Sequence, residues 1–139
     1  TRDELQQAAD SDQGIRGRWA RRLLARLDAG DTFASGSPYP LHVWLLGKEL
    51  KWIGMGAETV VDYALRFKQT WGAGTWVLGY SDDMLAYIPS RRVWEEGGYE
   101  GGSNLYEYGR PALRWNGDIE DRIAAAVERL FQKADQQAD

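Results

Sequence analysis

"LKWIGMGAETVVDYALRFKQTWGAGTWVLGY", residues 50–80, gives the clearest indication of the fold. An apolar run over 50–56 leads into a helical pattern over 58–71, and a second apolar run follows over 75–80. Two strands joined by a helix within about 30 residues form a βαβ unit, in which the strands pair in parallel through a right-handed crossover. The stretch therefore predicts an α/β fold built on parallel strand pairing.

The N-terminal part of the chain adds a hairpin, a helix and two irregular segments. A further apolar run over 41–47 lies just before 50–56, and the two predict a β-hairpin. Residues 15–29 place tryptophan and leucine on one helical face and arginines mostly on the other, which predicts a helix with a solvated basic face. Residues 1–14 are polar and predict a loose arm or a frayed helix end, and the turn-forming residues of 30–40 predict a linker.

The C-terminal part is expected to hold a long glycine-rich loop and a final helix. Residues 81–102 contain two glycine pairs and predict a loop with a helical turn or two. Asp118 can cap a helix whose apolar residues recur at helical spacing: Ile119, Ile123, Val127, Leu130 and Phe131. With helices flanking the βαβ unit at both ends, residues 1–139 form a single domain or a fragment of a larger one.

Composition narrows the class of protein. Hydrophobic residues make up 43% and charged residues 27% of the chain, which is typical of a soluble globular domain. The formal net charge of −4 argues against a nucleic-acid partner. The absence of cysteine excludes disulfides and cysteine-rich zinc sites, and no apolar run reaches the roughly 20 residues of a transmembrane helix. Because the chain begins with Thr1 instead of Met, we expect a processed product or a fragment.

The edge at which the two parallel strands end is where the sequence places a candidate site, because ligands collect beyond the carboxyl ends of such strands. Glu58 follows the first strand and Tyr87 lies in the loop after the second, so we expect them within reach of each other. Tyr99 stands between the two glycine pairs, whose flexible backbone lets it fold over the same edge.

Each of these residues also has a structural interpretation. A glutamate at a helix N-terminus gains about 0.3–1 kcal/mol from the helix dipole, which alone accounts for Glu58. Tyr87 and Tyr99 are equally compatible with core tyrosines. The sole histidine, His42, is expected to be a packed residue of an apolar strand, and residues 81–83 can cap a short helix.

Two motifs change this balance. "WIGMGAETVVDYALRFK" (52–68) and "GYSDDMLAYIPSRRVWEEGGYEGGS" (79–103) resemble the neutral/alkaline non-lysosomal ceramidase family, and most closely its bacterial ceramidase-like branch. The resemblance runs from about residue 39 to about residue 130 and corresponds to the later part of the family's catalytic domain. It implies a zinc-dependent amidohydrolase of sphingolipid metabolism, in which metal-activated water cleaves the N-acyl amide of a ceramide-like lipid. It also suggests an exported, periplasmic or extracellular protein.

The family holds its zinc ion with two histidines, a glutamate and a tyrosine. By motif, Glu58 carries over as the glutamate ligand and Tyr87 as the tyrosine ligand. Tyr99 carries over as the catalytic, substrate-binding tyrosine that hydrogen-bonds the substrate amide or the oxyanion. This chain has Gly56 and Ala57 before the glutamate, where the better-known ceramidases have Pro-Gly. The resemblance therefore does not identify the substrate.

The family's two histidine ligands belong to upstream sequence that we expect to lie outside this chain, so the chain alone is expected to be inactive. The runner-up is a non-catalytic lipid- or sugar-binding module. Its contact surface would be the aromatic residues of the loop-rich region: Trp94, Tyr99, Tyr106, Tyr108 and Trp115. A degenerate ceramidase relative without activity is the third interpretation.

Overall fold

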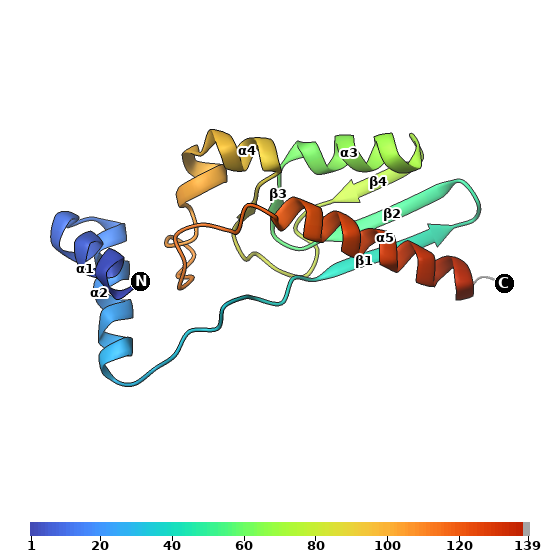
Figure 1. Ribbon diagram of the computed structural model, residues 1–139. Helices are drawn as coiled ribbons and strands as arrows, with labels where there is room; N and C mark the ends of the chain where they lie inside the picture. Colours follow the sequence, from blue (N-terminus) through green and yellow to red (C-terminus); the bar gives the residue numbers. More distant parts are fainter. Residues whose placement is uncertain (138–139) are drawn as a thin grey trace.

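The computed structural model describes residues 1–137 and has a mixed α/β fold (Figure 1). The central sheet has three strands in the order β1-β2-β4. Strands β1 (Leu41–Leu46) and β2 (Leu50–Met55) form the predicted antiparallel hairpin, with Trp44 opposite Trp52. Strand β4 (Thr75–Leu78) pairs with β2 in parallel, with Ile53 opposite Val77. The predicted α/β class and the flanking helices are therefore confirmed.

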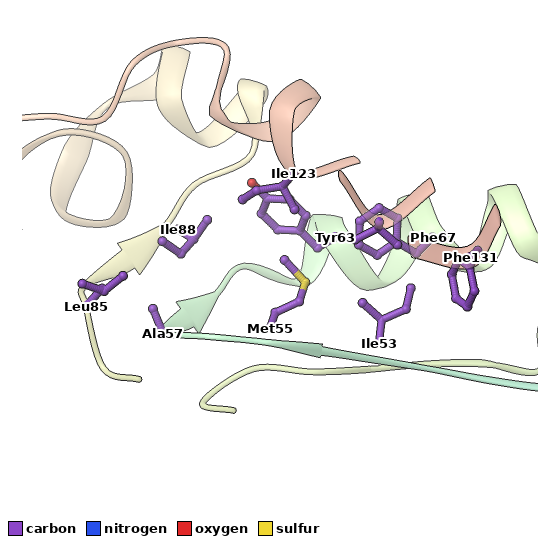
Figure 2. Packing of buried hydrophobic residues seen from close by; sticks show 10 residues of the cluster. Ile53, Met55, Ala57, Tyr63, Phe67, Leu85, Ile88, Ile123 and Phe131 are labelled. Carbon is purple, nitrogen blue, oxygen red and sulfur yellow. The ribbon is translucent and has the colours of Figure 1, made fainter. Parts of the chain in front are cut away.

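Helices α3 (Val61–Trp71) and α5 (Ile119–Gln137) cover one face of this sheet. Figure 2 shows side chains from β2, α3 and α5 pointing toward one another in the core. The fully buried members include Ile53, Met55, Tyr63, Phe67 and Val127. Burying apolar side chains of this size stabilises the fold by about 1.5–3 kcal/mol each, so this layer holds the sheet and both helices together.

The N-terminal segment corrects one prediction. Residues 1–14 are not a loose arm, because α1 (Arg2–Ser11) is a capped helix in which Thr1 and Glu4 form a capping box. It packs against α2 (Ile15–Asp28) through buried alanines, and this hairpin lies at the left of Figure 1, away from the sheet. The predicted helix over 15–29 is confirmed, and residues 31–40 run without helix or strand.

The structure also contains a second sheet, which has two short strands. Strands β3 (Glu58–Thr59) and β5 (Tyr87–Ile88) pair in parallel. The helix-dipole interpretation of Glu58 required this residue to begin a helix. It does not, because α3 starts three residues later. Beyond β5 the glycine-rich region forms α4 (Arg91–Glu96) and a π-helix, η1 (Tyr99–Ser103), and so is less irregular than predicted.

Two apolar faces that the sequence suggests are buried lie at the surface. The run over 75–80 predicts a buried strand, but Trp76 in β4 is 56% exposed. On α3 the inward face carries Tyr63 and Phe67, whereas Val61 and Leu65 point outward and are 66% and 62% exposed. Helical spacing alone did not distinguish these two faces, because both carry apolar residues.

Candidate functional site

The structure brings Glu58 and Tyr87 together as direct partners across the β3–β5 pair. Partnered residues of parallel strands project from the same face, so the carboxylate and the phenol lie side by side. Backbone hydrogen bonds fix this arrangement: the Glu58 N–H donates to the Ala86 carbonyl at 3.1 Å, and the Ala57 N–H donates to the Asp83 carbonyl at 2.6 Å. The expected proximity of the glutamate and the tyrosine therefore comes from strand pairing.

The Glu58 carboxylate raises the pKa values of two neighbouring tyrosines. Interaction with this carboxylate is the main cause that raises the pKa of Tyr87 above its usual value. The same interaction with Tyr80 raises the pKa of Tyr80 to about 12. A negative carboxylate beside a phenol disfavours the phenolate, so both tyrosines are protonated at neutral pH.

Tyr99 lies next to this pair. Its ring centroid is 5.5 Å from that of Tyr87, at an interplanar angle of 70°. Its hydroxyl donates to Glu107 Oε2 at 2.8 Å, and this hydrogen bond raises the pKa of Tyr99 to about 12. The side chain is 41% exposed, so Tyr99 is no core tyrosine.

The glycines around Tyr99 have two different structural roles. Gly97 and Gly98 adopt positive φ angles of 75° and 68°, which reverse the chain ahead of η1. Gly101 instead allows close packing, because a Cβ at this position would lie 2.0 Å from the Val93 carbonyl oxygen. The first pair turns the backbone, and Gly101 lets η1 pack against α4, which together place Tyr99 beside Tyr87.

Asn104 connects the two tyrosines, and the sequence did not reveal it. Its side chain is buried at 2% exposure. Oδ1 accepts from the Tyr87 N–H at 3.3 Å, and Nδ2 donates to the Tyr99 carbonyl at 2.7 Å and the Glu100 carbonyl at 3.3 Å. An asparagine that follows Gly-Gly-Ser is an ordinary turn residue, so its sequence context does not indicate this role.

His42 corrects another prediction. It is not packed in the core, because its side chain is 45% exposed and its Nε2 lies 2.5 Å from Asp82 Oδ2. Asp82 adopts a φ of 75° in a bend and caps no helix. The sole histidine, on β1, is thus paired with Asp82 in the loop that follows β4.

The aromatic residues proposed for a binding module are mostly committed to internal contacts. Trp94 Nε1 donates to the Trp115 carbonyl at 2.9 Å, and Trp115 Nε1 donates to the Tyr87 carbonyl at 2.7 Å. Tyr106 packs against Trp19 of α2, with ring centroids 6.2 Å apart. Trp115 thus contacts the backbone of Tyr87. Tyr99 and Tyr108 are the exposed members of the set.

A different aromatic surface lies on the sheet face opposite α3 and α5. Trp44, Trp52 and Trp76 form one row across the three strands, with centroid separations of 5.6 Å and 6.4 Å. Trp44 and Trp76 are 54% and 56% exposed. Alternation along each strand could have indicated this row, because Trp44 and Trp52 alternate with the core residues Val43 and Ile53.

The side chains of Glu58 in β3 and Tyr87 in β5 are of the chemical types that zinc accepts as ligands. A carboxylate and a phenol supply hard oxygen atoms, and zinc accepts oxygen ligands alongside histidine nitrogens. Within residues 1–137, however, no group of three or more His, Cys, Asp or Glu side chains could hold a metal ion. Glu58 and Tyr87 would therefore supply at most two of the roughly four ligands that a zinc ion takes.

No protein-family model, curated protein or solved structure matches the chain. Among the helices of the described region, none is long and apolar enough to cross a membrane.

Proposed function

We propose that this chain forms part of the catalytic domain of a zinc-dependent amidohydrolase that cleaves N-acyl amides, as the resemblance to the ceramidase family implies. The observation that carries the proposal is the direct pairing of Glu58 with Tyr87 on adjacent parallel strands. The motif resemblance assigns these two residues as ligands of one ion, and the pairing supports that assignment because ligands of one ion must lie together.

In this proposal Glu58 and Tyr87 hold the metal ion, which supplies a Lewis acid that lowers the pKa of water. Tyr99 binds the substrate. The phenol, whose pKa Glu107 raises to about 12, carries its proton at neutral pH and would donate a hydrogen bond to the amide carbonyl. The donor strengthens its interaction as negative charge develops on that oxygen, which favours the transition state over the substrate.

Tyr99 must exchange partners to do this. Its hydroxyl donates to Glu107 at an exposed position where water competes for the same groups. Because this hydrogen bond is exposed to water, rotation of the hydroxyl toward a substrate carbonyl has a small cost. The hydrogen bond to Glu107 therefore leaves the Tyr99 hydroxyl available to a substrate.

The remaining two ligands are expected to be histidines from sequence outside this chain, because its one histidine is already paired with Asp82. The isolated chain should therefore bind zinc weakly and show no hydrolysis of N-acyl amides above a protein-free control. Turnover by this chain alone would contradict the assignment.

Calorimetric zinc titration tests the ligand pair. We expect weak, saturable binding by the chain and at least a tenfold loss of affinity in Glu58→Gln and in Tyr87→Phe, because each change removes one of the two ligands. Glu95→Gln is the matched control, since Glu95 is an exposed glutamate on α4. Equal affinity in all four proteins, or no binding by any, would refute the proposal.

A second candidate function is a non-catalytic binding module, and the exposed tryptophan row of β1, β2 and β4 favours it. Aromatic faces stack on apolar surfaces of lipids and sugars. Tryptophan fluorescence with oligosaccharides or lipid vesicles provides the readout. Binding that survives Glu58→Gln and Tyr87→Phe but is lost in Trp76→Ala would favour the module over the amidohydrolase.

A further inference from the structure

We propose that the groove between α2 and the 106–109 turn binds a small phosphate monoester whose phosphate is attached to an apolar group. The groove has a volume of about 480 Å³, within the range of about 300–1,000 Å³ that is typical of small-molecule sites. It is lined by Ile15, Arg18, Trp19, Arg22, Tyr106, Glu107, Tyr108 and Gly109. The inference goes beyond the proposed function, because it requires neither zinc nor hydrolysis.

Contacts between α2 and the turn build the floor of this groove. Trp19 is 4% exposed, and its Nε1 donates to the Arg110 carbonyl at 2.7 Å. Its ring packs against Tyr106, with ring centroids 6.2 Å apart. The turn is closed by the Gly109 N–H, which donates to the Tyr106 carbonyl at 3.1 Å. These contacts hold the two sides of the groove in fixed positions relative to each other.

Two arginines give the groove its positive charge. Arg18 and Arg22 are four residues apart on α2 and therefore share one side of the helix. Neither forms an ion pair with the described residues, whereas Arg26 on the same helix pairs with Asp31 at 2.7 Å. Like charges at this spacing repel each other, and an anion that contacts both guanidinium groups would offset that repulsion.

The turn side of the groove fixes the position of one of these arginines. A Cβ at Gly109 would lie 3.1 Å from Arg22 Nη2, so this nitrogen lies against the backbone of the turn. Glu107 is the acidic residue of the lining, and its Oε2 accepts from the Tyr99 hydroxyl at 2.8 Å. Two guanidinium groups and one carboxylate leave the groove positive in a chain whose formal net charge is −4.

The chemistry of the lining favours a phosphate that carries an apolar group. The three free oxygens of a phosphate monoester can accept from two planar guanidinium groups at once, whereas a carboxylate has two oxygens. Ile15 and Tyr108 in the same lining are 53% and 36% exposed, so they offer apolar surface to the rest of a ligand. Inorganic phosphate would use the arginines alone and leave this surface uncovered.

Phenyl phosphate is the probe, and NMR titration of the ¹⁵N-labelled full chain without zinc gives its affinity and its location. Inorganic phosphate, which lacks the ring, and benzoate, which lacks the phosphate, are titrated in parallel. Arg18→Gln and Arg22→Gln each remove one positive charge. Arg16→Gln is the matched control, because Arg16 is an exposed arginine of α2 outside the lining. Tyr108→Ala removes the exposed ring.

We expect phenyl phosphate to shift the Gly109 amide resonance saturably and to bind about tenfold more weakly in Arg18→Gln and in Arg22→Gln. Arg16→Gln should bind as the wild type does. Inorganic phosphate should bind more weakly than phenyl phosphate, and Tyr108→Ala should remove that difference.

The absence of saturable binding by phenyl phosphate, or an equal loss of affinity in Arg16→Gln, would overturn the site. Benzoate that binds as tightly as phenyl phosphate would overturn the assignment of a phosphate group. Inorganic phosphate that binds as tightly would overturn the assignment of an apolar part. None of these results depends on zinc, so the proposed hydrolase function stands or fails separately.

Discussion

Asn104 is the residue whose removal should most directly loosen the candidate site. It is 2% exposed and links the backbone of Tyr87 in β5 to the backbone of Tyr99 in η1. Asn104→Ala removes three side-chain hydrogen bonds. At about 1 kcal/mol for each, the free energy of unfolding should fall by about 3 kcal/mol.

Urea unfolding followed by tryptophan fluorescence and circular dichroism measures this loss. A change of this size lowers the melting temperature of a domain of this length by about 10 °C. Asn116→Ala is the control, because Asn116 is an exposed asparagine of the same loop region and should change stability by less than about 0.5 kcal/mol.

Two results would refute this reasoning. If Asn104→Ala loses less than about 1 kcal/mol, the three hydrogen bonds contribute little beyond what water replaces. If stability falls as expected but the resonances of the Tyr87 and Tyr99 rings keep their wild-type positions, Asn104 supports the fold without positioning the tyrosines. In either case the link from Asn104 to the site would be wrong.

Three further predictions test the packing around the site. Gly101→Ala should destabilise by about 1–3 kcal/mol, because its Cβ meets the Val93 carbonyl oxygen at 2.0 Å, whereas Gly102→Ala, whose nearest contact is 3.7 Å, should be nearly neutral in urea unfolding. Phe67→Ala should lose about 3–5 kcal/mol of stability, and the exposed Leu65→Ala less than about 0.5 kcal/mol; equal losses would refute the assigned core face of α3. Asp62 accepts from Arg92 and Ser90, which hold its pKa below 3.8, so it stabilises the fold above that pH and the contribution disappears on acidification. Asp62→Asn should therefore flatten the stability profile at the acidic end, and an unchanged profile would contradict this.

The sequence predicted the elements that have a local pattern. The hairpin of β1 and β2, the helix of 15–28 and the helix after Asp118 all follow from apolar periodicity within one segment. The capping box of Thr1 and Glu4 is a sequence signal of the same kind that went unused, and it marks the helix that replaced the expected arm.

Elements that depend on distant partners were not predictable in this way. Residues 58 and 59 read as the start of a helix, but they form β3 because β5 lies beside them. Strands of two residues have no periodicity to detect, so their existence follows only from the tertiary pairing. The same limit applies to His42 and Trp76, since apolar strand context does not say which face of the sheet is covered.

The residues of the candidate site also fall into a group that the sequence indicated and a group that only the fold reveals. The motif resemblance identified Glu58, Tyr87 and Tyr99, and the structure brings all three together. It did not point to Asn104 or Glu107, because their contacts with the three residues form only in the folded chain.

We propose that Glu58 and Tyr87 together hold a zinc ion, and zinc titration of the isotopically labelled chain, followed by NMR, can decide this. We predict that the largest zinc-induced changes fall on the Glu58 carboxyl and the Tyr87 ring and disappear in Glu58→Gln. The rival location within the described residues is the exposed pair of His42 and Asp82. Zinc-induced changes that centre on His42 and persist in Glu58→Gln would contradict the claim.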